Sequence, residues 1–76
     1  MDLTRKQPLY DQLFDILRDK IQNDMAPGDL LPSERQLSQQ YGLSRTTVRL
    51  ALDSLEKMGL VTRRHGKGTF VADRSQ

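Results

Sequence analysis

Apolar side chains recur at three- and four-residue steps in the first third of the chain. The recurring positions are Tyr10, Leu13, Phe14, Leu17, Ile21 and Met25. This spacing places them on one face of a helix over roughly residues 8–25, where Pro8 suits the first turn. The turn signal Pro27-Gly28-Asp29 ends the helix. Methionine and aromatic residues at this spacing belong to a core, so we assign them no chemistry.

A second, shorter helix is predicted before the middle of the chain. Ser33 is a good N-cap, because its hydroxyl can accept a hydrogen bond from the backbone N–H of Gln36. The Gln36 side chain can reach back to Ser33, which completes a capping box. The helix is expected over residues 34–41, and Gly42 stops it in the left-handed conformation.

A third helix is predicted over residues 45–58, with Ser44 as its cap and Gly59 as its stop. Its buried stripe is predicted to consist of Val48, Ala51, Leu52, Leu55 and Met58. The tight turn between the second and third helices gives the order of a helix-turn-helix.

The last part of the chain has the pattern of a β-hairpin. Residues 60–64 and 69–72 are rich in β-forming side chains. Residues 65–68 supply a loop with two glycines that can adopt positive φ. Residues 30–32 are too few to predict as a strand. We consider a single β-bridge between this segment and the hairpin.

Together these elements predict a mainly α fold with a small β-hairpin, a winged helix-turn-helix of three helices plus a wing. The 76 residues are expected to form a single domain over residues 1–76, with its core in residues 8–72. A domain of this size has no second core to hold a cofactor or a deep substrate pocket.

Several classes of function are disfavoured by composition. The chain has no cysteine and one histidine, so no thiolate or histidine metal cluster is visible. No apolar run approaches the roughly 20 residues of a membrane span. No nucleophile–base pair is apparent, and the glycines of residues 65–68 lie in a hairpin, which is the wrong context for a nucleotide loop. We therefore expect a soluble, cytoplasmic protein that is not an enzyme and uses neither cofactor nor metal.

Charge is distributed unevenly along the chain. Residues 1–42 hold five Lys/Arg against seven Asp/Glu, a balance of −2, whereas residues 43–76 hold seven against three, a balance of +4. The basic half coincides with the third helix and the hairpin. This distribution suits a polyanion that contacts one face of the domain, although a solvated basic surface is the alternative.

The start of the third helix carries side chains suited to the major groove of DNA. They are Ser44, Arg45, Thr46, Thr47 and Arg49. An arginine fork can bond guanine O6 and N7 together, and threonine can bond a phosphate or touch a thymine methyl. The alternative for each of these side chains is an ordinary position on an exposed helix surface.

Two further groups of residues complete the candidate DNA-binding site. Arg35 begins the second helix, where a phosphate contact or a guanine contact is expected; the alternative is a salt bridge with Glu34 or Asp29. At the hairpin tip we select His65, Gly66 and Lys67, which lie beside Arg63 and Arg64. Positive side chains suit a narrow minor groove, and glycine allows close approach of the backbone. A bare, solubilising hairpin is the alternative.

The chain resembles the N-terminal DNA-binding domain of the GntR family of bacterial transcription regulators. The resemblance covers roughly residues 8–72 and is carried by long, ordered motifs. They are Pro8-Leu9-Tyr10, Pro27-Gly28-Asp29-Leu30-Leu31-Pro32-Ser33-Glu34-Arg35, Tyr41-Gly42-Leu43-Ser44-Arg45-Thr46-Thr47-Val48-Arg49 with Ala51-Leu52, Gly59-Leu60-Val61, and Gly66-Lys67-Gly68-Thr69-Phe70-Val71. The opening helix looks most like the HutC or YtrA-type branches.

The resemblance implies how such a domain meets DNA. It implies that the third helix enters the major groove and the wing tip the minor groove, with DNA contacts at Arg35, Arg45, Thr47, Arg49 and Gly66. It implies a homodimer on a palindromic operator. Family members carry a C-terminal domain that binds a small-molecule effector and usually builds the dimer. No such domain follows here, so we expect an excised domain, with a naturally short relative as the alternative; the domain is expected to be monomeric in solution and paired on DNA.

Two functions are carried forward. The leading hypothesis is sequence-specific binding of double-stranded DNA by the operator-reading module of a bacterial regulator, a metabolite-responsive repressor located in the nucleoid. The alternative is a winged helix used for protein–protein contact. That alternative needs an apolar patch on the outer face of the third helix, where only Leu50 is apolar, flanked by Arg49 and Lys57.

Overall fold

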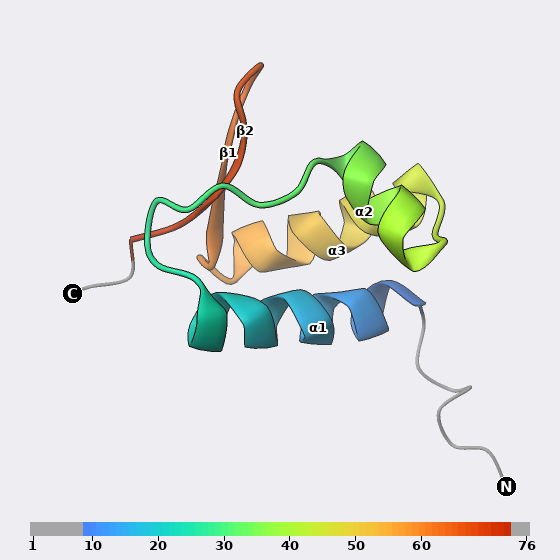
Figure 1. The fold of residues 1–76 in the computed structure, drawn as a ribbon, viewed down its shortest axis with the longest axis horizontal. Coiled ribbons are helices and arrows are strands. Elements are labelled where there is room, and N and C mark those ends of the chain that lie inside the picture. The colour runs from blue at the N-terminus through green and yellow to red at the C-terminus, as the bar shows by residue number, and fades with distance from the viewer. Residues whose placement is uncertain (1–8, 74–76) are drawn as a thin grey trace, which may run out of the picture.

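The computed structural model describes residues 9–73, and in that range three helices precede an antiparallel hairpin (Figure 1). The elements are α1 (Leu9–Asp24), α2 (Glu34–Tyr41), α3 (Arg45–Lys57), β1 (Val61–Arg64) and β2 (Gly68–Val71). The predicted winged helix-turn-helix is confirmed. The predicted helix start at Pro8 lies outside the described residues.

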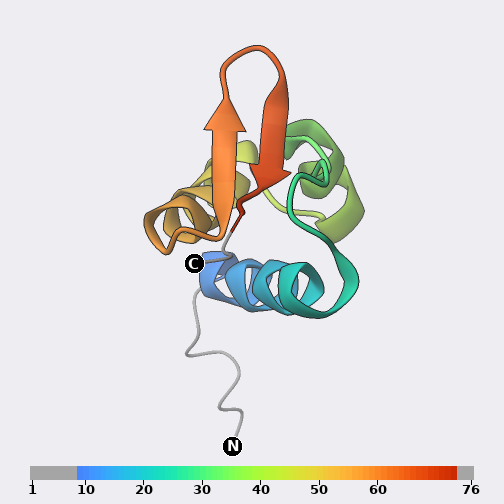
Figure 2. The same cartoon turned by 90° about the vertical axis from the view of Figure 1, so that its left-hand side faces the viewer.

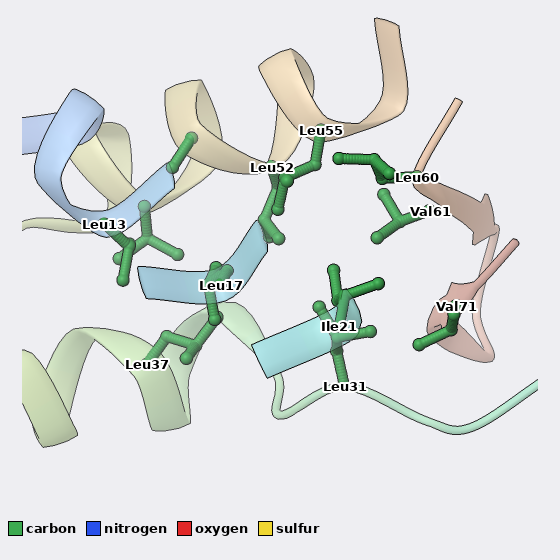
Figure 3. Close-up of a cluster of buried hydrophobic side chains, with 12 residues drawn as sticks. Leu13, Leu17, Ile21, Leu31, Leu37, Leu52, Leu55, Leu60, Val61 and Val71 are labelled. Carbon is green, nitrogen blue, oxygen red and sulfur yellow. The ribbon is translucent and has the colours of Figure 1, made fainter. Parts of the chain in front are cut away.

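A single apolar cluster holds the elements together. Its buried members are Leu13, Leu17, Ile21, Leu31, Leu37, Val48, Ala51, Leu52, Leu55, Leu60, Val61 and Val71 (Figure 3). The helical periodicity of the sequence supplies most of them, because α1 and α3 each turn one apolar stripe inward. Helix α1 lies along α3, α2 lies beside α3, and the hairpin extends away from α1 (Figures 1 and 2).

Local capping fixes the helix-turn-helix. The predicted capping box is present: the N–H of Gln36 donates to Ser33 Oγ at 3.1 Å, and the N–H of Ser33 donates to Gln36 Oε1 at 2.9 Å. Gly42 ends α2 with φ of 66°, in the left-handed region that a side chain disfavours. The turn that follows places Ser44 at the cap of α3.

Loss of the α2 cap gives a direct test of this local structure. Replacing Ser33 by alanine is expected to lower the free energy of unfolding by about 1 kcal/mol, because the backbone N–H of Gln36 loses its acceptor. Thermal denaturation should show a melting temperature lower by about 4–8 °C. Ser33→Asp restores an acceptor and serves as the control; equal losses in both variants would contradict the capping role.

The wing has a third participant from far earlier in the chain. Leu30 forms a bridge with Phe70, and the N–H of Leu31 donates to the carbonyl of Thr69 at 2.8 Å. The N–H of Val71 donates in turn to the carbonyl of Asp29, also at 2.8 Å. The single bridge considered for residues 30–32 is thus confirmed, and this segment lies along β2 as an additional edge.

Close packing at this edge explains one glycine of the wing. A Cβ placed on Gly68 would lie 2.9 Å from Leu30 Cδ1, and Gly68 has φ of +124°. Both the contact and the backbone conformation therefore exclude a larger residue without local rearrangement. The segment before α2 and the wing are fitted to each other at this point.

The prediction that Met58 is buried was wrong. Helix α3 ends at Lys57, one residue earlier than predicted, and the Met58 side chain is 62% exposed. Gly59, with φ of 76°, reverses the chain, and the N–H of Leu60 donates to the carbonyl of Leu55 at 2.9 Å. Leu60, which follows this reversal, is buried in the core.

Candidate nucleic-acid interface

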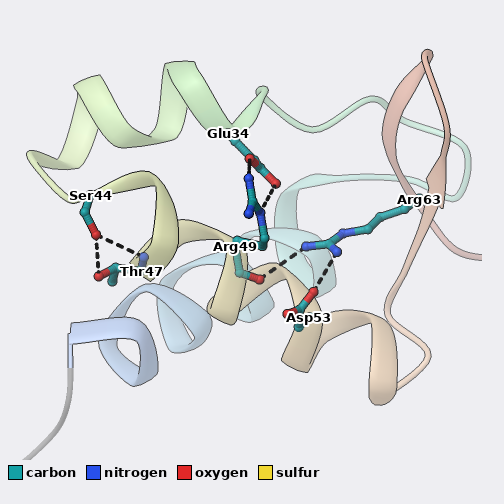
Figure 4. Close-up of polar contacts among 6 residues, drawn as sticks. All are labelled: Glu34, Ser44, Thr47, Arg49, Asp53 and Arg63. Atoms are coloured by element: carbon teal, nitrogen blue, oxygen red, sulfur yellow. Dashed lines mark hydrogen bonds and ion pairs between the residues drawn. The ribbon is translucent and has the colours of Figure 1, made fainter.

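The first turn of α3 is exposed and tightly capped. Ser44 Oγ accepts from the N–H of Thr47 at 3.1 Å and donates to Thr47 Oγ1 at 2.9 Å (Figure 4). Both hydroxyls therefore hold the helix start in place, and Thr47 Oγ1 keeps a proton to donate. Arg45 and Thr46 are exposed beside them. Within residues 9–73, no side-chain partner is recorded for Arg45, so its fork is available for a ligand.

Arg49 is held by an acidic residue of the preceding helix. Its Nε and Nη2 atoms lie 3.4 and 3.3 Å from the two carboxylate oxygens of Glu34, and 58% of its side chain is exposed (Figure 4). The hydrogen bond and the charge of Glu34 raise the pKa of Arg49 further, so its guanidinium stays protonated. The sequence suggested Glu34 as a salt-bridge partner of Arg35, and its contact with Arg49 was not predicted.

Arg35 stands at the start of α2 without the salt bridge considered for it. Of the two carboxylates weighed as partners, Glu34 accepts from Arg49, and Asp29 Oδ2 accepts from the N–H of Ala26 at 2.8 Å. Arg35 is exposed. Its position at a helix start leaves it accessible to an anion.

The wing tip forms a second group of candidate residues. His65, Gly66 and Lys67 are all exposed at the end of the hairpin. The N–H of Lys67 donates to the carbonyl of Arg64 at 2.9 Å and closes the turn, in which Gly66 has φ of 76°. The tip points away from α1 in both views (Figures 1 and 2). The candidate residues thus form two groups, one around the α2 and α3 starts and one at the tip.

Arg63 does not belong to the tip. Its Nη1 atom lies 2.6 Å from Asp53 Oδ1 and 3.9 Å from Glu56 Oε1, both on α3. Its Nη2 atom donates to the backbone carbonyl of Arg49 at 3.2 Å (Figure 4). The sequence did carry a signal for this, because the two-residue period of a strand puts Arg63 on the same face as buried Val61.

Other chemistries find little support in residues 9–73. No group of three or more histidine, cysteine or carboxylate side chains is placed to hold a metal there, and no helix is long and apolar enough to cross a membrane. On α3 the exposed large apolar side chain is Leu50, 44% exposed, and Met58 follows the end of the helix. These two residues are eight positions apart in the sequence and do not form the continuous patch that a protein-binding face needs.

Comparison with known proteins agrees with this geometry. The family model described as "Bacterial regulatory proteins, gntR family" matches residues 9–71. The repressor NagR of Bacillus subtilis is 46% identical over 66 residues, which are 86% of this chain and 27% of NagR. The repressor MngR of Escherichia coli is 40% identical over 68 residues, which are 88% of this chain and 28% of MngR. The chain therefore spans about a quarter of the length of these two repressors.

Solved structures give the same result in three dimensions. The AraR DNA-binding domain in complex with operator ORE1 superposes with a TM-score of 0.84 at 39% identity, covering 87% of this chain and 82% of that chain. A transcriptional regulator from Oenococcus oeni superposes with a TM-score of 0.85 at 33% identity, covering 97% of this chain and 62% of that chain.

Proposed function

Since this chain belongs to the GntR family of bacterial regulatory proteins, we propose that it binds double-stranded DNA sequence-specifically as the operator-reading domain of a transcription regulator. One observation carries the proposal. Helix α3 buries one stripe and leaves its arginine- and threonine-bearing first turns open, in a fold that AraR uses in a complex with operator DNA.

The proposed docking places the start of α3 in the major groove and the wing at the minor groove. An α-helix fits the major groove, and the N-terminal residues of a recognition helix reach the base edges. Arg45 and Arg49 are proposed to read bases, because a guanidinium fork matches the two acceptors of guanine. Thr46 and Thr47 bind phosphate or a thymine methyl, and Ser44 adds a contact at the helix start.

The remaining residues position the domain on the DNA backbone. Arg35, exposed at the start of α2, contacts phosphate or guanine. At the wing, Gly66 lets the backbone approach the groove wall, while His65 and Lys67 face its negative potential. Phosphate contacts of this kind fix orientation without reading sequence.

The regulatory setting is proposed from the family. Two copies pair on a palindromic operator, and the isolated domain is monomeric in solution. A metabolite effector acts through a further domain of the whole regulator, which works as a repressor in the cytoplasm, at the nucleoid. No catalytic step and no cofactor is assigned to the chain. Membership of the HutC or YtrA branch stays a prediction.

The proposal is tested by selection from a randomised pool of DNA duplexes at physiological salt, followed by sequencing. An enriched palindrome is the expected result, and its half-site spacing would reveal pairing on DNA. Salt-sensitive binding without enrichment would contradict sequence reading and leave a non-specific DNA binder. Absence of binding would favour the protein-interaction alternative.

Removal of the wing-tip cation gives a second test of the docking. Lys67→Ala is expected to weaken binding to all DNA sequences alike, because a phosphate contact carries no sequence information. The slope of log affinity against log salt should fall in magnitude by about one. Affinities for the selected operator and for an unrelated duplex, measured over a salt series, provide the check. A loss confined to the operator would contradict the assignment.

A further inference from the structure

We propose that Arg63 is a positioning residue that fixes the wing against α3, at the helical turn that carries Arg49. This inference rests on the proposed DNA-binding function and deepens it. In this inference Arg63 holds the base-reading group of α3 and the wing-tip group at a set distance from each other, and it makes no DNA contact of its own.

The contacts of Arg63 form a two-point attachment. One arm of the guanidinium binds the Asp53 carboxylate at 2.6 Å, and the other donates to the backbone carbonyl of Arg49 at 3.2 Å. The two acceptors lie four residues apart on α3, which places them one above the other along the helix. A planar fork that grips two neighbouring points of a helix restrains direction as well as distance. β1 is thereby oriented on α3.

The charge of Arg63 is largely compensated within the protein. Asp53 and Glu56 both lie within ion-pair distance of Nη1, and the side chain is 27% exposed. A phosphate would have to displace these carboxylates to bind the same fork. The neighbouring Arg64 is exposed and, by strand alternation, lies on the opposite face of β1. Arg63 and Arg64 therefore carry the same charge in different surroundings: Arg63 lies beside the carboxylates of α3, and Arg64 is exposed.

The direction of β1 determines where the wing tip lies. Arg63 is the third residue of β1, and only the pair Arg64–Gly68 separates it from the turn that carries Lys67, so a change of strand direction at Arg63 is passed on to Lys67. A tip displaced by about 1 Å no longer meets a groove wall while α3 stays seated in the major groove. The attachment therefore determines whether the wing contacts and the base contacts form together.

A double-mutant cycle between Arg63 and Lys67 tests the inference on the operator selected above. Alone, Lys67→Ala should weaken operator binding about five- to tenfold near 0.1 M salt. In an Arg63→Gln background, Lys67→Ala should weaken operator binding by about twofold or less, because the wing tip is already misplaced. Arg63→Gln itself should lower affinity and reduce the salt slope by about one, because the Lys67 contact is lost with it, and adding Lys67→Ala should reduce the slope no further. Arg64→Gln, a loss of the same charge on the other face, should combine additively with Lys67→Ala.

Asp53→Ala tests the same contact by removing the carboxylate that binds Arg63. Removing a negative charge near DNA should tighten binding if only electrostatics acts. The positioning role predicts the reverse: weaker operator binding and the same reduced effect of Lys67→Ala. A circular dichroism spectrum at the assay temperature and a thermal melting curve establish that each variant is folded before its affinity is measured.

The outcomes separate the inference from the proposed function. If the wild-type domain binds no selected duplex, the function fails and the inference fails with it. If the wild type binds but Arg63→Gln and Lys67→Ala are additive, only the inference is overturned. A salt slope that falls by about one in Arg63→Gln and by about one more when Lys67→Ala is added would identify a direct phosphate contact of Arg63 and overturn it as well.

Discussion

Arg49→Ala is expected to lose operator discrimination while leaving the fold intact. A bidentate arginine–guanine pair contributes about 1–3 kcal/mol of discrimination, so the ratio of operator to non-operator affinity should fall about 5- to 140-fold. The fold should survive because Arg49 is exposed, and its ion pair with Glu34 is a surface contact of the kind that contributes little to stability.

The measurement is the affinity for the selected operator and for a matched unrelated duplex at one salt concentration. Arg18→Ala is a suitable control: it removes the same charge from the exposed surface of α1, where Arg18 pairs with Asp15. The control should change both affinities little and their ratio not at all. Unchanged discrimination in Arg49→Ala would remove Arg49 from the base-reading group.

Leu55→Ala is expected to have the largest effect on stability. Leu55 is fully buried in the apolar cluster, and truncation of such a leucine costs about 2–5 kcal/mol. At about 0.05–0.15 kcal/mol per residue, a domain of 76 residues has a total stability of about 4–11 kcal/mol. The variant should therefore lose much of its stability, and its melting temperature should fall by about 10–30 °C.

Met58→Ala is the matched control for that change. The helical period assigns Leu55 and Met58 to one stripe, whereas the structure leaves the Met58 side chain in solvent. Its removal should alter the free energy of unfolding by less than about 0.5 kcal/mol. Urea denaturation of both variants gives the comparison. Similar losses at the two positions would contradict the observed end of α3.

Local signals explain why much of the fold was predictable. The apolar spacing of α1, the capping box at Ser33, and Gly42 in the left-handed region each depend on a few neighbouring residues. The two wing glycines belong to the same group of short-range signals. Consistency among such signals made the order of elements readable from the chain.

The errors and omissions share a tertiary origin. Met58 was misplaced because the reversal at Gly59 brings Leu60, not the next helical position, into the core. Arg49 and Glu34 are 15 residues apart, and their contact depends on how α2 crosses α3. Helical periodicity identifies the buried face of each helix, but it does not give the crossing angle that brings two exposed side chains together.

The edge formed by residues 28–31 makes the wing a discontinuous unit. Its strands come from residues 61–71, yet its outer edge comes from the connection between α1 and α2, and Leu30 occupies the space over Gly68. In a chimera that carries only the hairpin of a relative, the foreign hairpin would have to pair with residues 28–31 of this chain, which fit this chain's own hairpin. Exchange of wings within this fold must carry both segments together, and changes in the two segments are expected to be tolerated as pairs.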